Sequence, residues 1–179
     1  SRSKEINFGL IYRMGAEKLS IVTKSSKKES KEFIERFFQK YNTIHALQES
    51  FLEKARKEGF AETLFGRRRY LPDINKKGLL KSISEGAAIN TPIQGSAAEI
   101  MRMAMIRINS KFKEIKNTQC RMLLQIHDEL IFETAKSSVN EYSKIIKNEM
   151  SSVKDSNLHS FSIPLLVDIN LGSNWGDLH

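Results

Sequence analysis

The fold is decided by the stretch Leu123-Leu124-Gln125-Ile126-His127-Asp128-Glu129-Leu130-Ile131-Phe132-Glu133. Apolar residues alternate with other residues on both sides of His127-Asp128, and this period of two is typical of strands with one buried face. His127 and Asp128 are tolerated in a tight turn. The stretch therefore predicts a β-hairpin that holds Asp128 and Glu129 at its tip.

Two adjacent carboxylates at such a tip predict a cation site. Asp128 and Glu129 repel each other, and a divalent cation would relieve that repulsion, because hard oxygen ligands suit magnesium or manganese. The alternative is an ordinary hairpin with a solvated acidic turn. The rest of the chain has to decide between these two interpretations.

The composition favours a polyanionic partner. The chain has 179 residues, a formal net charge of +8 and a pI near 9.6. A basic balance of this size is typical of proteins that bind nucleic acid, although a lysine-rich surface can also serve solubility alone. The length allows one domain or two small lobes with a real core.

Several classes of protein are excluded by composition. No apolar run is long enough to span a bilayer, and no signal peptide opens the chain, so we expect no membrane partner. Cys120 is the only cysteine, which excludes an internal disulfide and a cysteine-rich zinc site. A lone cysteine suits a reducing compartment, and a bacterial cytoplasm and a DNA-containing organelle both fit.

The N-terminal residues predict a helix from Arg2 to Leu19 with an unusual stripe. Lys4, Phe8 and Tyr12 recur at four-residue intervals and so share one face. An ammonium group followed by two rings suits a nucleotide, because the cation meets phosphate and the rings stack on sugar or base. The alternative is a basic amphipathic helix whose aromatic side chains are buried.

The run Lys4-Glu5-Ile6-Asn7-Phe8-Gly9-Leu10-Ile11-Tyr12 resembles the fingers-helix motif of family A DNA polymerases, the bacterial DNA polymerase I type. The resemblance implies that Lys4 holds the incoming triphosphate and stabilises its charge, that Phe8 lies against the nucleotide, and that Tyr12 stacks at the template position. The family's leading Arg would precede Ser1. Arg13 stands where the family has Gly, and we expect it beside Gly9, where it would block close backbone approach. Arg13 then either alters the closing motion of the helix or is a deliberate substitution.

The middle of the chain offers a second basic site. A capping box at Ser26 opens one long amphipathic helix, for which Gly59 is the expected stop. The segment 61–73 then reads as an extended segment, a turn and an exit, in which Arg67, Arg68 and Arg69 are consecutive. They are candidate phosphate contacts, or else a solvated charge run. A very similar Gly-Arg-Arg segment joins fingers and palm in family A polymerases.

The region 85–109 predicts a helix that carries two amides on one face, Asn90 and Gln94. Amides can read the minor-groove acceptors common to all base pairs, although a well-packed Ala/Met-rich core helix explains the pattern too. Thr91-Pro92 predicts a helix start or kink there. The run 88–98 resembles the polymerase motif whose Asn and Gln contact the primer-template duplex. The family's preceding Arg is Gly86 here, and Lys81 or the three arginines are candidates to compensate.

The hairpin itself resembles the palm motif in which His-Asp-Glu borders the primer 3′ end. The resemblance implies that Asp128 binds both catalytic metals, that Glu129 is a supporting carboxylate, and that His127 contacts the primer. After it we expect a helix over 137–152 and a closing strand over 163–171.

Three motifs in the family's order imply an α+β protein: mostly helical fingers (1–75) plus the C-terminal portion of a palm with an antiparallel β-hairpin (76–179), a fragment of a right-hand polymerase fold. The implied function is template-directed DNA synthesis, with two Mg²⁺ ions (or Mn²⁺), primer-template DNA and deoxynucleoside triphosphates. The palm's N-terminal part and the thumb would be further parts of the same polypeptide. Because the family's other metal-binding Asp lies before Ser1, we expect no synthesis by these residues alone. A non-catalytic duplex-DNA-binding module is the other interpretation.

Overall fold

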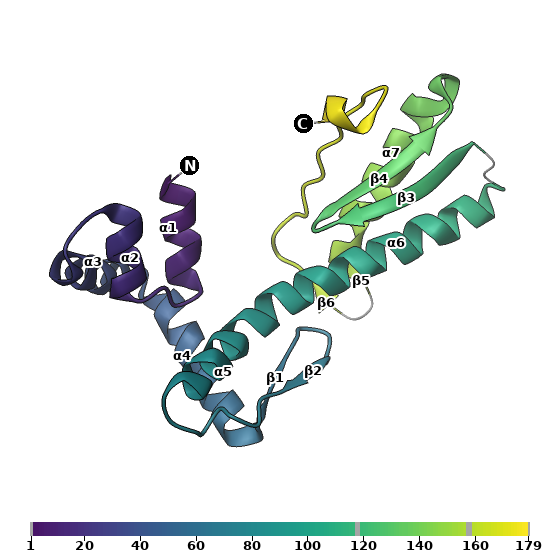
Figure 1. Cartoon of the computed structure of the whole chain (residues 1–179). Coiled ribbons are helices and arrows are strands. Elements are labelled where there is room, and N and C mark those ends of the chain that lie inside the picture. Colours follow the sequence, from purple (N-terminus) through teal and green to yellow (C-terminus); the bar gives the residue numbers. More distant parts are fainter. Residues whose placement is uncertain (1, 117–118, 157–158, 179) are drawn as a thin grey trace. The chain divides into compact units, whose positions relative to one another are not determined.

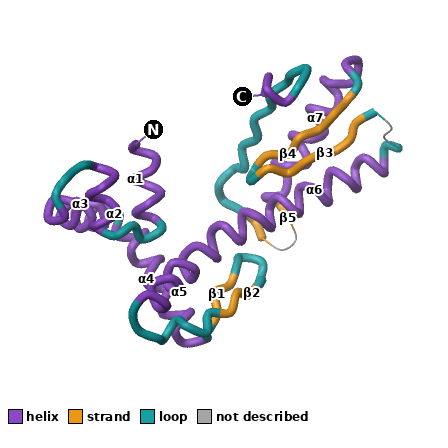
Figure 2. Tube along the Cα trace, viewed as in Figure 1, coloured by secondary structure: helices purple, strands orange, loops and turns teal. Residues whose placement is uncertain are grey.

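The computed structural model describes residues 2–116, 119–156 and 159–178, without the side chains of 154–156 and 159–160. It is mostly helical, with short antiparallel strand pairs (Figures 1 and 2). The chain divides into two compact units, Ser1–Gly95 and Ser96–His179. These are packing units, and the division at residue 75 between fingers and palm stays a prediction. None of the described helices is both long and apolar enough to cross a membrane.

The first unit contains five α-helices and one strand pair among its described residues. Their bounds are α1 Arg2–Ile11, α2 Ala16–Thr23, α3 Lys27–Lys40, α4 Asn42–Glu58, β1 Phe60–Glu62, β2 Arg68–Tyr70 and α5 Leu79–Asn90, followed by a π-helical turn over Thr91–Gly95. In the second unit the chain continues as α6 Ser96–Glu114, β3 Cys120–Ile126, β4 Glu129–Thr134, α7 Val139–Ser151, β5 Asp155–Ser156 and β6 His159–Ser160. Short 3₁₀ turns occupy Lys136–Ser138, Ser152–Lys154 and Trp175–Leu178.

The expected single helix over residues 2–19 is wrong, because α1 ends at Ile11 and α2 starts at Ala16. The end of α1 is closed by the amide of Arg13 donating to the Leu10 carbonyl and the amide of Met14 donating to the Gly9 carbonyl. This pair of hydrogen bonds is a Schellman motif, which stops a helix by turning one residue into the left-handed region. Helix propensity alone did not predict this break between α1 and α2.

The capping signals of the next helices behave as expected. Ser26 and Glu29 form the predicted capping box at the start of α3, and Gly59 ends α4 with φ +78°. The single long helix expected between them is wrong, because Tyr41 leaves the helical conformation and separates α3 from α4. The buried cluster of this unit joins α4 and α5 with the strand pair and comprises Leu52, Ala55, Ala61, Leu71, Ile74, Ala88 and Ile89.

The second unit is built on the predicted hairpin. Strands β3 and β4 pair antiparallel, with Ile126 opposite Glu129 and Arg121 opposite Glu133. An irregularity between Met122 and Leu124 leaves Leu123 without a partner. One face of the hairpin packs on α6 and α7 through a cluster of Ile108, Cys120, Tyr142 and Ile146, with Phe112, Met122, Leu130, Phe132, Ile145 and Met150 around it.

The closing strand expected over residues 163–171 is wrong. This segment has no regular secondary structure, and Ile163, Leu166 and Leu171 are exposed. A strand needs a neighbour that accepts its hydrogen bonds, and in the described part of the chain β3 and β4 pair only with each other. The apolar pattern of this segment therefore did not indicate a strand.

Candidate nucleotide- and DNA-binding site

Helix α1 presents the predicted cation and ring to solvent. Lys4 is exposed, and its Nζ lies 5.9 Å from the centre of the Phe8 ring, which is 50% exposed. Tyr12 follows the end of α1, is half-buried and packs against the core of the first unit. The structure thus places Lys4 and Phe8 together on an open face, whereas Tyr12 turns toward α5.

Tyr12 connects this helix to one of the predicted DNA-reading amides. The Gln94 Nε2 donates a hydrogen bond to the Tyr12 hydroxyl at 3.2 Å. The two residues were assigned separately from the sequence, to a nucleotide stripe and to a duplex contact. The hydrogen bond shows that the Tyr12 and Gln94 side chains are neighbours within the first unit.

Arg13 does not lie beside Gly9 on a helix, so that expectation is wrong. Its φ is +63°, the conformation in which glycine is preferred at the end of a Schellman motif because a Cβ is unfavourable there. The side chain that covers Gly9 is Met14, which would meet any Cβ built on Gly9. A glycine after the tyrosine is therefore favoured by backbone conformation rather than by close approach of another element.

The predicted DNA-contacting residues of the first unit surround one cavity. This cavity of about 240 Å³ is lined by Thr63, Arg67, Arg68, Arg69, Asn90, Thr91, Gln94 and Gly95. The Oδ1 of Asn90 and the Oγ1 of Thr91 are buried and make no hydrogen bond within the described chain. Buried polar atoms are normally satisfied, so these two oxygens are exceptions among the side chains of the residues that line this basic cavity.

The three arginines are held differently. Arg68 pairs with Glu62 at 3.2 Å and lies over the Phe60 ring at 4.4 Å, and these contacts fix it on the strand pair. Arg67 and Arg69 are exposed at the cavity. A Cβ built on Gly95 would lie 2.6 Å from the Thr63 Cγ2, so only glycine lets the π-helical turn approach the strands this closely.

The hairpin of the second unit carries the acidic pair at an exposed tip. Asp128 and Glu129 are both exposed, and their carboxylates have no hydrogen bond or ion pair among the described residues. His127 has φ +52°, and the Gln125 Nε2 donates to its carbonyl at 3.2 Å. A non-glycine residue in this region is strained, and such strain clusters at functional sites.

The chemistry of this tip fits a divalent cation only in part. Two free carboxylates are suitable ligands for magnesium or manganese. However, the described residues contain no group of three or more His, Cys, Asp and Glu side chains that could hold a metal ion. Asp128 and Glu129 therefore form at most part of a ligand set.

Comparison with known proteins identifies the family. The family model for DNA polymerase family A matches residues 1–177. This chain belongs to DNA polymerase family A. Its relatives include the thermostable DNA polymerase I of Thermus thermophilus, 41% identical over 176 residues, which cover 97% of this chain and 20% of that protein. The DNA polymerase I of Pseudomonas aeruginosa is 39% identical over 178 residues, which cover 99% of this chain and 19% of that protein.

A solved structure supports the same assignment. The family A chain resembles the POL domain of Pol1 from M. smegmatis in complex with DNA primer-template and dNTP, with a TM-score of 0.90 and 33% identity, covering 99% of this chain and 30% of that chain. The expected fold class is confirmed, because a mostly helical chain with an antiparallel hairpin matches part of a polymerase domain. The chain spans about a fifth of the length of the curated relatives it matches.

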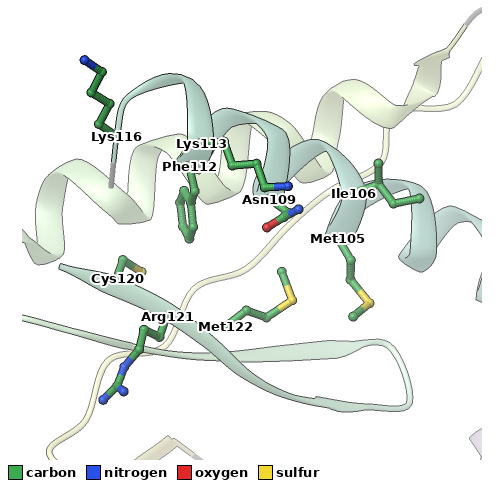
Figure 3. A pocket seen from close by; sticks show the side chains of 9 residues that line it. All are labelled: Met105, Ile106, Asn109, Phe112, Lys113, Lys116, Cys120, Arg121 and Met122. Atoms are coloured by element: carbon green, nitrogen blue, oxygen red, sulfur yellow. The ribbon is translucent and has the colours of Figure 1, made fainter. Parts of the chain in front are cut away.

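A groove in the second unit was not predicted from the sequence of this family A chain. It holds about 670 Å³ between α6 and β3 and is lined by Met105, Ile106, Asn109, Phe112, Lys113, Lys116, Cys120, Arg121 and Met122 (Figure 3). Burial raises the pKa of the Cys120 thiol. None of the residues predicted to bind nucleotide, DNA or metal lines this groove.

Two further residues were missed by sequence reasoning. Gln48 is buried, and its Nε2 donates to the Leu10 and Ile11 carbonyls at 3.3 and 2.7 Å. Glu85 accepts a hydrogen bond from Arg56 at 2.6 Å. Both are polar side chains inside helices, and a polar residue at a buried helical position gives no signal until its partner is known.

Proposed function

We propose that this chain takes part in template-directed DNA synthesis, in which deoxynucleotides are added to a primer 3′ end. Membership of DNA polymerase family A supports this function. A similar solved domain was described with DNA primer-template and dNTP. The observation that carries the proposal is the exposed hairpin tip, where the carboxylates of Asp128 and Glu129 have no protein partner among the described residues.

Asp128 and Glu129 are the groups that would hold divalent cations, with Asp128 as the metal ligand and Glu129 beside it. When bound, two such ions stabilise the charge that develops on a transferred phosphoryl group and on the attacking and leaving oxygens. The strained turn at His127 fixes the direction in which the two carboxylates leave the hairpin. His127 is the proposed contact to the primer end.

Lys4 and Phe8 are the proposed nucleotide-binding residues. A lysine ammonium is a mobile point charge that suits a triphosphate, and Lys4 is exposed on the same face as Phe8. The half-exposed Phe8 ring offers a stacking surface for a base or sugar. Tyr12, at the end of the helix, is proposed to stack at the template position. These side chains position the nucleotide and stabilise its charge, which is the protein's main contribution to phosphoryl transfer.

The cavity between the strand pair and the π-helical turn is the proposed duplex contact. Arg67, Arg68 and Arg69 supply cations for backbone phosphates, which set affinity and register without reading sequence. Asn90 and Gln94 supply amides, which suit the acceptors that every base pair shows in the minor groove. Both kinds of group line one cavity, so one duplex can meet them together.

The alternative is a DNA-binding module without synthesis. The net charge of +8 and the basic cavity would serve such a module equally well. The two functions differ at Asp128, which synthesis requires and duplex binding does not.

The experiment compares Asp128→Asn with Asp168→Asn in the complete protein. Asp168 is an exposed aspartate outside helices and strands and controls for the loss of one negative charge. We expect Asp128→Asn to lower the rate of primer extension by on the order of 10²–10³-fold, the typical loss when one group of a preorganised electrostatic site is removed. Asp168→Asn should leave it unchanged. DNA binding without extension in the unaltered protein would instead identify the module.

A second assay tests the expected incompleteness of the metal site. The 179 residues alone should not extend a primer, because the described chain lacks a third ligand near the acidic pair. Extension by these residues would contradict the assignment of a missing ligand.

A further inference from the structure

Two helices of the first unit end in the same way with a cation. Arg13 follows α1 with φ +63°, and Lys24 follows α2 with φ +55°. Each donates its amide to the carbonyl three residues back, and the next amide reaches the carbonyl five residues back. Glycine is the usual residue at this position because a Cβ is unfavourable in the left-handed region. An arginine or lysine there carries a conformational cost that glycine would not.

The side chain of Arg13 enters a group of cations around one carboxylate. Glu85 is held by Arg56 at 2.6 Å, while the Arg13 guanidinium lies 3.6 Å and the Lys81 ammonium 3.8 Å from it. Glu85 is their only ion-pair partner among the described residues. Three cations around one anion leave two positive charges uncompensated at this point of the surface.

Besides its ion pair with Glu85, the Arg13 guanidinium keeps donors available for a second anion. At 3.6 Å its approach to Glu85 is longer than a hydrogen bond, and the side chain is 40% exposed. A Cβ built on the neighbouring Gly86 would meet no atom within 4 Å, so the surface beside Glu85 is open. Lys24 shares the backbone conformation, but it has no ion pair in the described part of the chain and so lies outside any such cluster.

We propose that Arg13 contacts a backbone phosphate of bound DNA, with the surplus charge of Arg56 and Lys81 supporting it. The proposal rests on DNA being the substrate, as proposed above, and adds a residue to its binding surface. Arg13 adjoins Tyr12, whose hydroxyl is hydrogen-bonded to Gln94. Arg13 thus directly follows a residue that contacts a side chain already assigned to DNA. A guanidinium suits a phosphate because its planar donors match phosphate oxygens.

The test compares four variants of the complete protein: Arg13→Gly, Arg13→Gln, Arg13→Lys and, as the matched control, Lys24→Gly. The binding of a labelled primer-template duplex with a single-stranded overhang is followed by fluorescence anisotropy between 50 and 200 mM salt. Thermal stability is measured on the same samples. Arg13→Gly and Lys24→Gly both remove one cation and one left-handed side chain, so they differ only in where the cation lay.

Loss of one phosphate contact reduces the slope of log affinity against log salt by about 0.9. Arg13→Gly and Arg13→Gln should show this smaller slope. The ratio of the affinity of the unaltered protein to that of either variant should therefore fall by roughly 3.5-fold when the salt is raised from 50 to 200 mM. Arg13→Lys and Lys24→Gly should keep the original slope. Both glycine variants should be at least as thermostable as the unaltered protein, because they relieve the backbone conformation.

A purely structural Arg13 would give a different result. Its loss would change thermal stability, while the salt slope of Arg13→Gly and Arg13→Gln would equal that of Lys24→Gly, and this outcome overturns the proposal. Primer extension by the unaltered protein is measured in parallel. If DNA binds without extension, the proposal of synthesis fails while the slopes still decide the role of Arg13.

Discussion

Gln48 is expected to determine how firmly α1 is held on the first unit. Its side chain is 5% exposed, and its Nε2 donates to the Leu10 and Ile11 carbonyls. No backbone amide of the described residues donates to the Ile11 carbonyl. The last carbonyls of a helix have no partner within the helix, so Gln48 satisfies a group that would otherwise be left without a partner.

The perturbation is Gln48→Met, which keeps the approximate length of the side chain but removes both donors. Each lost hydrogen bond costs about 0.5–1.5 kcal/mol, so the attachment of α1 should weaken by about 1–3 kcal/mol. At about 1.4 kcal/mol per factor of ten, this corresponds to a roughly 5- to 140-fold larger equilibrium constant for the opening of α1. Because α1 carries Lys4 and Phe8, nucleotide affinity should fall in the same variant.

The assay is amide hydrogen exchange of the α1 residues in the complete protein. The matched control is Gln39→Met, which changes an exposed glutamine on α3. Exchange of α1 amides should accelerate in Gln48→Met and stay unchanged in Gln39→Met. If the two variants exchanged α1 amides within twofold of each other, Gln48 would not hold the helix and the reasoning would be refuted.

Two further predictions concern the packing of each unit. Gly95→Ala places a Cβ 2.6 Å from the Thr63 Cγ2. It should lower the free energy of unfolding, measured in urea, by about 1–3 kcal/mol. Gly86→Ala, at an open helical site, should raise the free energy of unfolding by up to about 1 kcal/mol. Adding Thr63→Ser should rescue Gly95→Ala, and a failure to rescue would exclude this clash. Burial raises the pKa of the Cys120 thiol above its ordinary value near 9. The folded state therefore keeps the thiol proton to a higher pH than the unfolded state does, and the free energy of unfolding should fall as the pH rises above that ordinary value. Cys120→Ala should make the free energy of unfolding less dependent on pH in this range. An unchanged pH dependence would contradict the assignment of this effect to Cys120.

Local signals in the sequence were enough for much of the molecule. The period-two pattern around His127-Asp128 predicted the hairpin and its acidic tip, because alternation depends only on neighbouring residues. The capping box at Ser26 and the stop at Gly59 were also predicted, since a helix end is specified by residues within one turn of it. The helix expected over 137–152 corresponds to α7, whereas the helix region expected over 85–109 covers only the end of α5 and most of α6.

The errors arose where a boundary depends on contacts that are distant in sequence. The break after Ile11 occurs despite a helical pattern that continues through Leu19. Its Schellman hydrogen bonds are local, but the Ile11 carbonyl that the break leaves open accepts from Gln48, which lies 37 residues away. The segment 163–171 has a strand-like pattern but no partner strand among the described residues. Propensity describes a single segment, and hydrogen bonds between segments override it.

The sequence alone determined which residue types are available for chemistry: a lysine and aromatic rings near the start, three arginines, two amides and an acidic pair. Only the tertiary structure placed the arginines and amides around one cavity, joined Tyr12 to Gln94, and put Arg13 in a left-handed position beside Glu85. These pairs are separated by tens of residues along the chain, and their proximity follows from helix packing around a shared core rather than from any local pattern.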